Sequence, residues 1–365
     1  MWGERPLFRG AEDDRGFGDL LSLDDVDRIV SSHGLRLPAF RLVRDGDTLP
    51  TSGYTKTTRT GSEAATGVMD AKAVYREFAA GATLVFQGMH RYWQPLALFC
   101  RQLEKSLGHP VQANAYVTPP GSQGFDAHED EHDVFVLQSH GTKRWKVHER
   151  HDLPPTRAPL IDSAIGPGDS LYIPVGFPHS ASTQEDASVH VTVGILSLTW
   201  GTVLSEAMKL AEGDLIVGDP LPLRFSHHEN LPQLVEERLA DLGALIAKSD
   251  ATVITELLRR RFLTTRQPVL RGQIHQLLAL DDLTDESLVH KREGAICVLA
   301  SADDEISVLL GDRELRMPAW LESALRAILE HDRLLVSDLA PYLDRSSRLV
   351  LVRRLIVEGL LEVIE

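Results

Sequence analysis

The sequence has little of what marks secreted, membrane-spanning or nucleic-acid-binding proteins. It holds only two cysteines in 365 residues, so no disulfide framework is implied and a reducing compartment is expected. No apolar run approaches the roughly 20 residues of a membrane span, and the start lacks the charged-then-apolar order of a signal peptide. Basic residues number 38 against 53 acidic ones, and the net charge of −15 disfavours phosphate-backbone binding. We therefore expect a cytoplasmic protein that does not bind a membrane and whose charge suits basic partners.

What is present is the composition of an ordinary globular protein, with 43% hydrophobic and 25% charged residues. From residue 111 to about residue 198, short strand-like runs alternate with turns rich in Gly and Pro. This pattern is typical of a double-stranded β-helix, which is a jelly-roll barrel. The chain is long enough for two or three domains.

Three residues of this stretch form a candidate metal site. His128 and Asp130 follow Gly and Pro turn signals, and His179 follows the apolar run that begins at Ser170. Residues i and i+2 of a strand point to the same face, so a strand would let the first two grip one ion. Two imidazoles and one carboxylate are the ligand set of a mononuclear Fe(II) centre with three open positions.

Two other interpretations compete with this one. A His-x-Asp pair is expected about once by chance in a chain of this composition, so the pair alone is weak. Residues 128–132 also read His-Glu-Asp-Glu-His, the H-E-x-x-H pattern of zinc proteases, which requires a helix. The flanking glycines and the β-branched run that follows favour strand over helix, so we expect His132 to be a polar residue lining the site.

Several motifs together resemble the JmjC-type 2-oxoglutarate oxygenases of the ribosomal oxygenase (cupin-4) family. The residues that carry this resemblance are Asn114 to Pro119, Gly121 to Phe125, His128-x-Asp130, Val134 to Gln138, Gly141-x-Lys143-Arg144-Trp145, and Pro167 to Pro174 leading to His179. The residue between the first two ligands is the acidic Glu129, where an aromatic residue is common in the family. This departure concerns the substrate pocket and not the metal.

The resemblance implies a role for each matching residue. It assigns His128, Asp130 and His179 as metal ligands, Lys143 as the cation that pairs with the distal carboxylate of 2-oxoglutarate, and Asn114 and Thr192 as polar partners of that cosubstrate. A fixed positive charge is also what a dicarboxylate chelated at one end requires at the other, although Lys143 could instead be a solvated strand-end lysine. His190 shares strand parity with Thr192, so we expect His190, and with it Tyr116, to lie near the ligands, the alternative for His190 being a core histidine. His140, His148 and His151 lie in charged, turn-rich surroundings and are expected at the surface.

Outside the barrel the sequence predicts three further parts. Residues 1–110 read as a mixed cap that completes a catalytic domain of residues 1–203, and within it residues 54–67 read as an exposed loop. Residues 204–280 have apolar stripes at helical spacing, and the resemblance implies a dimerisation module and hence a homodimer. Residues 281–365 have the order of a winged helix, but residues 286–365 carry fifteen acidic and ten basic side chains, which argues against direct DNA binding.

These observations predict a mixed α+β protein that is an Fe(II)- and 2-oxoglutarate-dependent dioxygenase. The resemblance implies hydroxylation by dioxygen of an Arg or His side chain in a ribosomal protein, and it leaves open whether a demethylase activity exists. Two alternatives remain. One is the same chemistry on a peptide natural product or a small metabolite, and the other is a non-catalytic cupin that holds a metal and only binds a partner.

Overall fold

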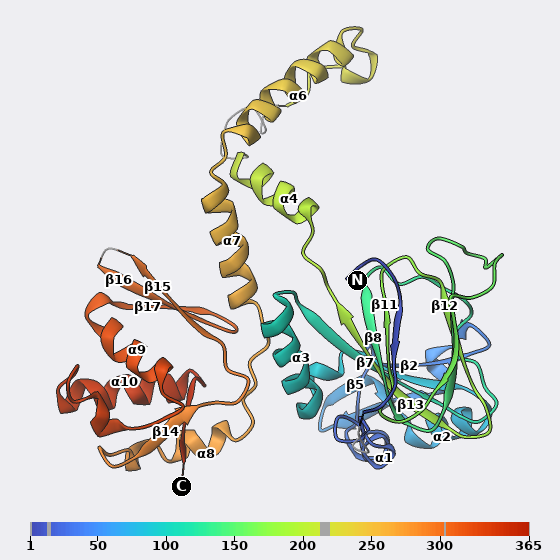
Figure 1. Ribbon diagram of the computed structural model, residues 1–365, viewed down its shortest axis with the longest axis horizontal. Coiled ribbons are helices and arrows are strands. Elements are labelled where there is room, and N and C mark those ends of the chain that lie inside the picture. The colour runs from blue at the N-terminus through green and yellow to red at the C-terminus, as the bar shows by residue number, and fades with distance from the viewer. Residues whose placement is uncertain (1, 13–15, 212–219, 303, 365) are drawn as a thin grey trace. The chain divides into compact units, whose positions relative to one another are not determined.

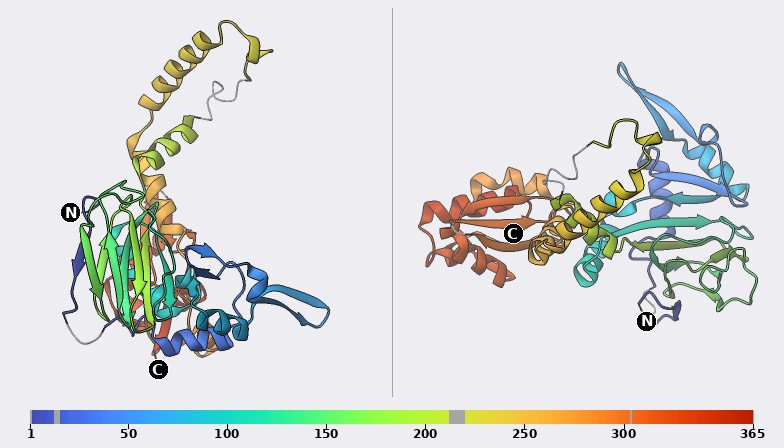
Figure 2. Two further views of the ribbon diagram at one scale, coloured as in Figure 1. Left: turned by 90° about the vertical axis from the view of Figure 1, so that its right-hand side faces the viewer. Right: turned by 90° about the horizontal axis from the view of Figure 1, so that it is seen from above.

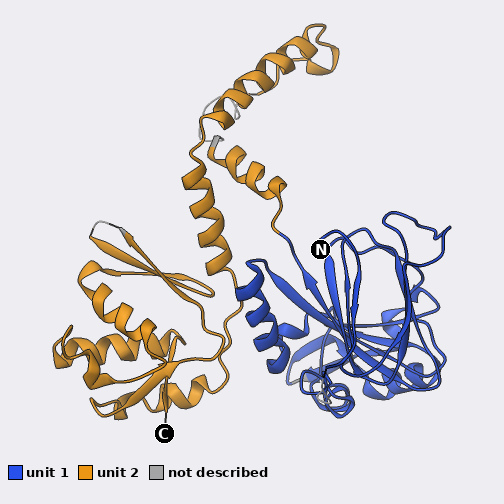
Figure 3. Cartoon of the chain, viewed as in Figure 1, with its two compact units in different colours: residues 1–197 blue, residues 198–365 orange. Residues whose placement is uncertain are grey.

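The computed structural model describes residues 2–12, 16–211, 220–302 and 304–364. The chain divides into two compact units, residues 1–197 and residues 198–365 (Figure 3). Each unit is described by itself. The three-part division expected from the sequence remains a prediction. None of the helices within the described ranges is long and apolar enough to cross a bilayer.

The first unit is built on two antiparallel sheets (Figure 1). The larger one has eight strands in the order β1 (Leu7–Arg9), β11 (Ser170–Ile173), β8 (Asp133–His140), β13 (Ser188–Ile195), β7 (Val111–Thr118), β6 (Thr83–Phe86), β2 (Phe40–Arg44) and β3 (Asp47–Thr48). The smaller one has three, in the order β10 (Ile161–Ile165), β9 (Lys143–Val147) and β12 (His179–Thr183). The strands that carry the candidate site therefore belong to both sheets.

Side chains on the two faces of the central strands pack into two different cores. One core lies against the helices, and the other lies between the two sheets. Ala113, Ala115 and Val117 of β7 pack in one core with Val189, Val191 and Val193 of β13. The same core holds buried residues of α1 (Leu23–Ser32), α2 (Ala71–Ala79) and α3 (Gln94–Leu107). Because side chains alternate along a strand, the even-numbered residues of β7 and β13 face the other way. A second core, which includes Val136, Trp145 and Leu171, lies between the two sheets.

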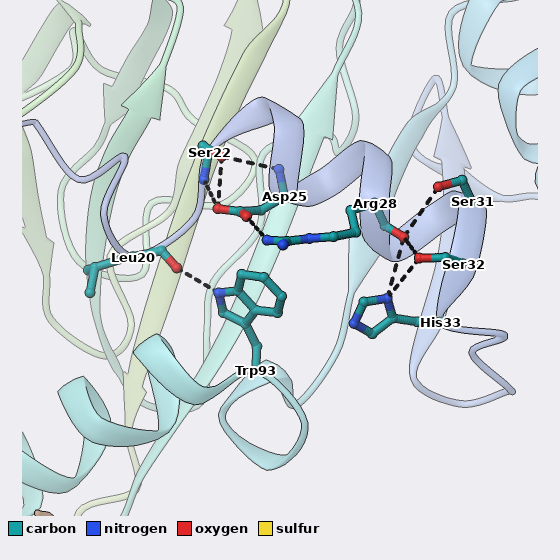
Figure 4. Close-up of polar contacts among 8 residues, drawn as sticks. All are labelled: Leu20, Ser22, Asp25, Arg28, Ser31, Ser32, His33 and Trp93. Atoms are coloured by element: carbon teal, nitrogen blue, oxygen red, sulfur yellow. Dashed lines mark hydrogen bonds and ion pairs between the residues drawn. The ribbon is translucent and has the colours of Figure 1, made fainter. Parts of the chain in front are cut away.

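Figure 4 shows the polar contacts that join α1 to the residues before α3. Ser22 and Asp25 form a reciprocal capping box at the start of α1, a device that stabilises a helix end by about 1 kcal/mol. Asp25 also pairs with Arg28, whose guanidinium lies 5.3 Å from the centroid of the Trp93 ring. The Trp93 indole N–H donates to the Leu20 carbonyl at 2.8 Å. These contacts join α1 to the start of α3.

The expectation of an exposed loop at residues 54–67 is wrong in its secondary structure. Residues in this region form the hairpin β4 (Thr55–Thr60) and β5 (Glu63–Met69), which projects from its unit in Figure 2. The threonines of β4 are β-branched and suit an extended strand. The Gly- and Ser-rich composition marks the turn at Gly61 and not the whole segment.

The second unit combines helices with two small sheets. The α-helices in its described residues are α4 (Trp200–Ala211), α6 (Leu231–Ala247), α7 (Ala251–Thr264), α8 (Gln273–Leu278), α9 (Glu322–Glu330) and α10 (Arg345–Val357). One sheet has the order β18 (Arg333–Leu335), β14 (Leu288–Lys291), β19 (Leu361–Ile364), and the other β15 (Cys297–Ala302), β16 (Glu305–Leu310), β17 (Glu314–Pro318). A separate apolar core holds both sheets to α9 and α10.

Candidate functional site

The three predicted metal ligands meet at one point in the first unit. One potential ligand atom from each of His128, Asp130 and His179 lies within 4.8 Å of the others. The Asp130 carboxylate faces both imidazoles, with Oδ1 4.0 Å from His128 Nε2 and Oδ2 3.6 Å from His179 Nε2. Among the described residues no lysine or arginine pairs with Asp130. Its negative charge is therefore available to a cation.

The backbone brings the ligands together in a way that differs from the expected strand. His128 and Asp130 lie outside any regular strand, in the segment between β7 and β8. An isolated antiparallel bridge joins His128 to His179, the first residue of β12, with a backbone hydrogen bond in each direction at 3.1 and 2.9 Å. The segment is not helical, which removes the geometry that the protease pattern requires. The placement on one strand was wrong, but the extended backbone at His128 keeps its side chain beside His179.

Both imidazoles are oriented for metal binding. Nδ1 of His128 lies 2.8 Å from the carbonyl oxygen of Asp126, and Nδ1 of His179 lies 3.0 Å from that of Phe177. An Nδ1–H that donates to a carbonyl leaves the lone pair on Nε2, which is the atom facing Asp130 in each ring. Burial, together with the nearby His128 ring, lowers the pKa of His179. A neutral imidazole is the form that ligates a metal, so the residues present fit a divalent ion.

A cavity of about 210 Å³ surrounds this point, and the other predicted site residues line it. Asn114 and Tyr116 reach it from β7, and His190 and Thr192 from β13, as strand alternation requires. Lys143 lines it from β9. The carbonyl oxygen of the Asn114 side chain accepts a 2.9 Å hydrogen bond from the backbone N–H of Gly88, which fixes that amide.

Lys143 is a buried cation and not a solvated strand-end lysine. Only 3% of the residue is exposed, and its Nζ donates to Thr118 Oγ1 at 3.0 Å. Burial lowers the pKa of this ammonium to about 7. Among the residues that the structure describes, this amine has one neutral hydrogen-bond partner and no carboxylate partner, which suits it to binding an anionic ligand.

Six aromatic side chains form a closed circuit of ring contacts around the cavity. The rings follow one another in the order His128, Phe125, Tyr116, His190, Trp145 and His179, and neighbouring centroids are 4.5 to 6.0 Å apart. His190 and Tyr116 are nearly parallel at 4.9 Å. Burial, and then the charge of Lys143, hold the pKa of His190 well below its usual range, so this ring is neutral. We call this set the aromatic circuit.

His132 lies in the cavity lining, whereas Glu129 does not. His132 lines the cavity, and its Nε2 lies 2.8 Å from the amide nitrogen of Gln112. The ring packs so closely on Gly194 that a Cβ there would lie 2.6 Å from Nε2. Glu129 instead pairs with His151, 3.2 Å from its Nδ1, and is not part of the cavity lining. The unusual acidic residue between the ligands therefore does not alter the cavity wall.

The sequence did not indicate the positions of two residues, one in the cavity lining and one outside it. Arg41 of β2 lines the cavity; its only signal was an arginine within the otherwise apolar run 37–43. His148 was expected at the surface but is buried, because its backbone N–H bonds to the Pro178 carbonyl and continues the pairing of β9 with β12. His140 and His151 are exposed, as expected.

Residues 89–203 match the JmjC domain family. Ribosomal oxygenase 1 from Rattus norvegicus is 36% identical over 135 residues, which are 33% of this chain and 22% of that protein. Ribosomal oxygenase 2 from Mus musculus is 31% identical over 179 residues, 44% of this chain and 38% of that protein. The bifunctional lysine-specific demethylase and histidyl-hydroxylase NO66 from Drosophila persimilis is 34% identical over 133 residues, 33% of this chain and 19% of that protein. The chain thus spans well under half the length of these relatives.

Among solved structures, the Escherichia coli ribosomal oxygenase YcfD in complex with cobalt and 2-oxoglutarate is similar in fold. It is 20% identical, with a TM-score of 0.58, and the similarity covers 100% of this chain and 96% of that one. The mixed fold with a JmjC-type barrel is thereby confirmed, while the dimerisation module and the winged-helix-like domain remain predictions. Residues 89–203 of the chain thus match the JmjC domain family, and about a third of the chain is similar in sequence to the ribosomal oxygenases.

Proposed function

We propose that this protein is an Fe(II)- and 2-oxoglutarate-dependent hydroxylase that acts on a ribosomal protein, at an Arg or His side chain. The observation that carries the proposal is the meeting of His128, Asp130 and His179 in a cavity that also holds the buried cation Lys143. Three ligands from one side leave coordination positions open for a chelating cosubstrate and dioxygen. The names of the similar proteins support the ribosomal substrate class.

Each group in the cavity has a part in this chemistry. Iron bound by the three ligands would supply dioxygen activation coupled to decarboxylation of 2-oxoglutarate. Lys143 would bind the distal carboxylate of the cosubstrate, with Asn114 and Thr192 as further polar partners. The aromatic circuit would exclude water around the reacting groups. The protein would thus orient and enclose the cosubstrate and the target side chain, while the iron would perform the oxidation.

In the deciding experiment, the protein is reconstituted with Fe(II) and 2-oxoglutarate under argon. Ribosomal proteins from a strain that lacks this protein are then added, and the mixture is exposed to air. Mass spectrometry of the intact proteins should show a gain of one oxygen on a single ribosomal protein, with matching succinate. Succinate without any mass gain would retain the oxygenase chemistry and move the substrate elsewhere. The absence of both would favour a metal-holding protein that only binds a partner.

The affinity for 2-oxoglutarate should fall as the pH rises. The lowered pKa of Lys143, about 7, means that its charge is lost above neutral pH in the free protein, and binding the dicarboxylate must then take up a proton. The dissociation constant should rise by up to about tenfold per pH unit above this pKa. Calorimetry with manganese-loaded protein under argon, from about pH 7 to about pH 9, measures this slope. Lys143→Arg keeps its charge throughout, so an equal slope in that variant would exclude Lys143 as the titrating group.

We further propose that the helical segment of the second unit forms a homodimer. Trp200 and Leu204 of α4 and Leu239 of α6 expose 84%, 56% and 62% of their surface, which is unusual for such large apolar residues in neighbouring helices. Wild type should have twice the monomer mass in light scattering, and Leu204→Glu with Leu239→Glu should lower it to the monomer. Val350→Glu, at an exposed apolar residue of α10, is the matched control. A monomeric wild type would exclude the dimer.

A further inference from the structure

Arg41 reaches the cavity from the cap and not from the barrel strands. On β2 its neighbours Phe40 and Leu42 are fully buried in the core against the helices, so Arg41 faces the opposite side of the sheet. The register places it beside Val85 of β6, which in turn pairs with Tyr116 of β7. Arg41 of the cap and Tyr116 of the aromatic circuit are therefore both register partners of Val85, on either side of β6.

The guanidinium of Arg41 has an aromatic contact but no acceptor. Its central carbon lies over the Phe125 ring, 5.3 Å from the ring centroid, which is within the range of a cation–π contact. Within the described residues it makes neither a hydrogen bond nor an ion pair, and its Nε is buried without a partner. Arg44, on the same strand, differs: it lies 3.7 Å from Glu77 and donates to the Ala80 carbonyl. The N–H groups of the Arg41 guanidinium are therefore available to donate hydrogen bonds to a ligand.

Lys143, and not Arg41, is the cation that we assign to the cosubstrate. Lys143 donates a hydrogen bond to Thr118 and acts electrostatically on His190, whereas the Arg41 guanidinium lies over the Phe125 ring and acts electrostatically on Tyr116. The two cations therefore adjoin different members of the aromatic circuit. A dicarboxylate held by the metal at one end and by Lys143 at the other leaves Arg41 unused.

Charge balance indicates what Arg41 can accept. In the loaded site, a divalent ion and Lys143 are balanced by Asp130 and the two carboxylates of the cosubstrate. Arg41 then leaves one excess positive charge in a cavity of about 210 Å³. A cationic side chain entering this space would meet like charge at short range, whereas a neutral or anionic acceptor would gain charge-assisted hydrogen bonds.

We propose that Arg41 determines substrate specificity, by donating hydrogen bonds to a neutral or anionic acceptor on the target side chain and by excluding arginine and lysine side chains from the cavity. This inference rests on the proposed hydroxylase function. It sharpens that function, because it separates an Arg target from one that carries an acceptor.

The test measures binding without turnover. Capped Gly-X-Gly tripeptides, with Gln, Glu or Arg at X, are added to protein loaded with manganese and 2-oxoglutarate under argon, and paramagnetic line broadening reports those bound near the ion. Wild type should bind the Gln and Glu peptides at least about tenfold more tightly than the Arg peptide, the effect of a charge-assisted hydrogen bond. Arg41→Gln should reduce this difference to about twofold, Arg41→Lys should still exclude the Arg peptide, and Arg41→Glu should reverse the order.

Arg44→Gln is the matched control and should keep the wild-type order, and thermal melts confirm that each variant is folded. The inference is overturned if wild type binds the three peptides alike, or if folded Arg41→Gln still discriminates. It is also overturned if Arg41→Gln loses as much affinity for 2-oxoglutarate as for the peptides, since Arg41 would then bind the cosubstrate. A wild type that binds neither manganese nor 2-oxoglutarate would overturn the hydroxylase proposal itself, and this inference with it.

Discussion

Replacing Asp130 with alanine should reduce 2-oxoglutarate turnover by more than about 100-fold while leaving the protein folded. Asp130 is the only carboxylate in the proposed ligand set and faces both imidazoles, so its loss would remove one of the three proposed ligands and the only anion among them. Changing a residue that merely supports a ligand commonly costs 10- to 100-fold in metal affinity or activity, and a ligand itself should cost more. Succinate formation and bound manganese measure the effect. We expect the same of His128→Ala.

Glu131→Ala provides the control for this substitution. Glu131 is exposed and lies one residue from Asp130, so it changes the local charge equally without touching the three ligand atoms. Its turnover should stay within about twofold of wild type, because exposed charges interact weakly through water. Unchanged turnover and metal content in Asp130→Ala would remove the proposed triad.

Replacing Lys143 with methionine should weaken 2-oxoglutarate binding by about 10- to 100-fold and also raise the thermal stability of the free protein. The first effect follows from loss of the charge-assisted hydrogen bond to the distal carboxylate. The second has the opposite sign, because burial lowers the pKa of Lys143 from 10.5 to about 7. The folded state therefore disfavours the charged form, and this penalty is present at neutral pH and disappears as the pH rises toward the unfolded value. A methionine side chain fills the same space without the cost of burying a charge.

Lys146→Met on the same strand is the control, since Lys146 is exposed on the outer face of β9. Calorimetry and thermal melts should show neither effect there. Equal 2-oxoglutarate affinity in wild type and Lys143→Met would mean that another group binds the distal carboxylate. A fall in melting temperature would show that the hydrocarbon stem of Lys143, and not its charge, dominates the local energy.

Local patterns in the sequence predicted the barrel, whereas the cosubstrate residues Asn114, Lys143 and Thr192 were assigned from the family resemblance. Strand parity makes Asn114 and Tyr116, or His190 and Thr192, share a face wherever their strand lies. Residues whose position depends on pairing between distant segments were harder to place. Arg41 enters the cavity only because β2 joins the sheet beside β6, and His148 is buried only because β9 continues beside residue 178. Neither pairing leaves a periodic signal.

The aromatic circuit has a further consequence for how such a protein can diverge. Its rings come from β7, β9, β12, β13 and the segment before β8, so each is held by its neighbours and none can change size without disturbing the next. Lys143 and Arg41 stand outside it, on separate strands. If our proposals hold, a substitution at Arg41 would change which target side chains are admitted, and one at Lys143 would weaken cosubstrate binding, while the proposed metal ligands stay in place. The residues around the proposed metal site are therefore constrained by one another, whereas Arg41 can change independently of them.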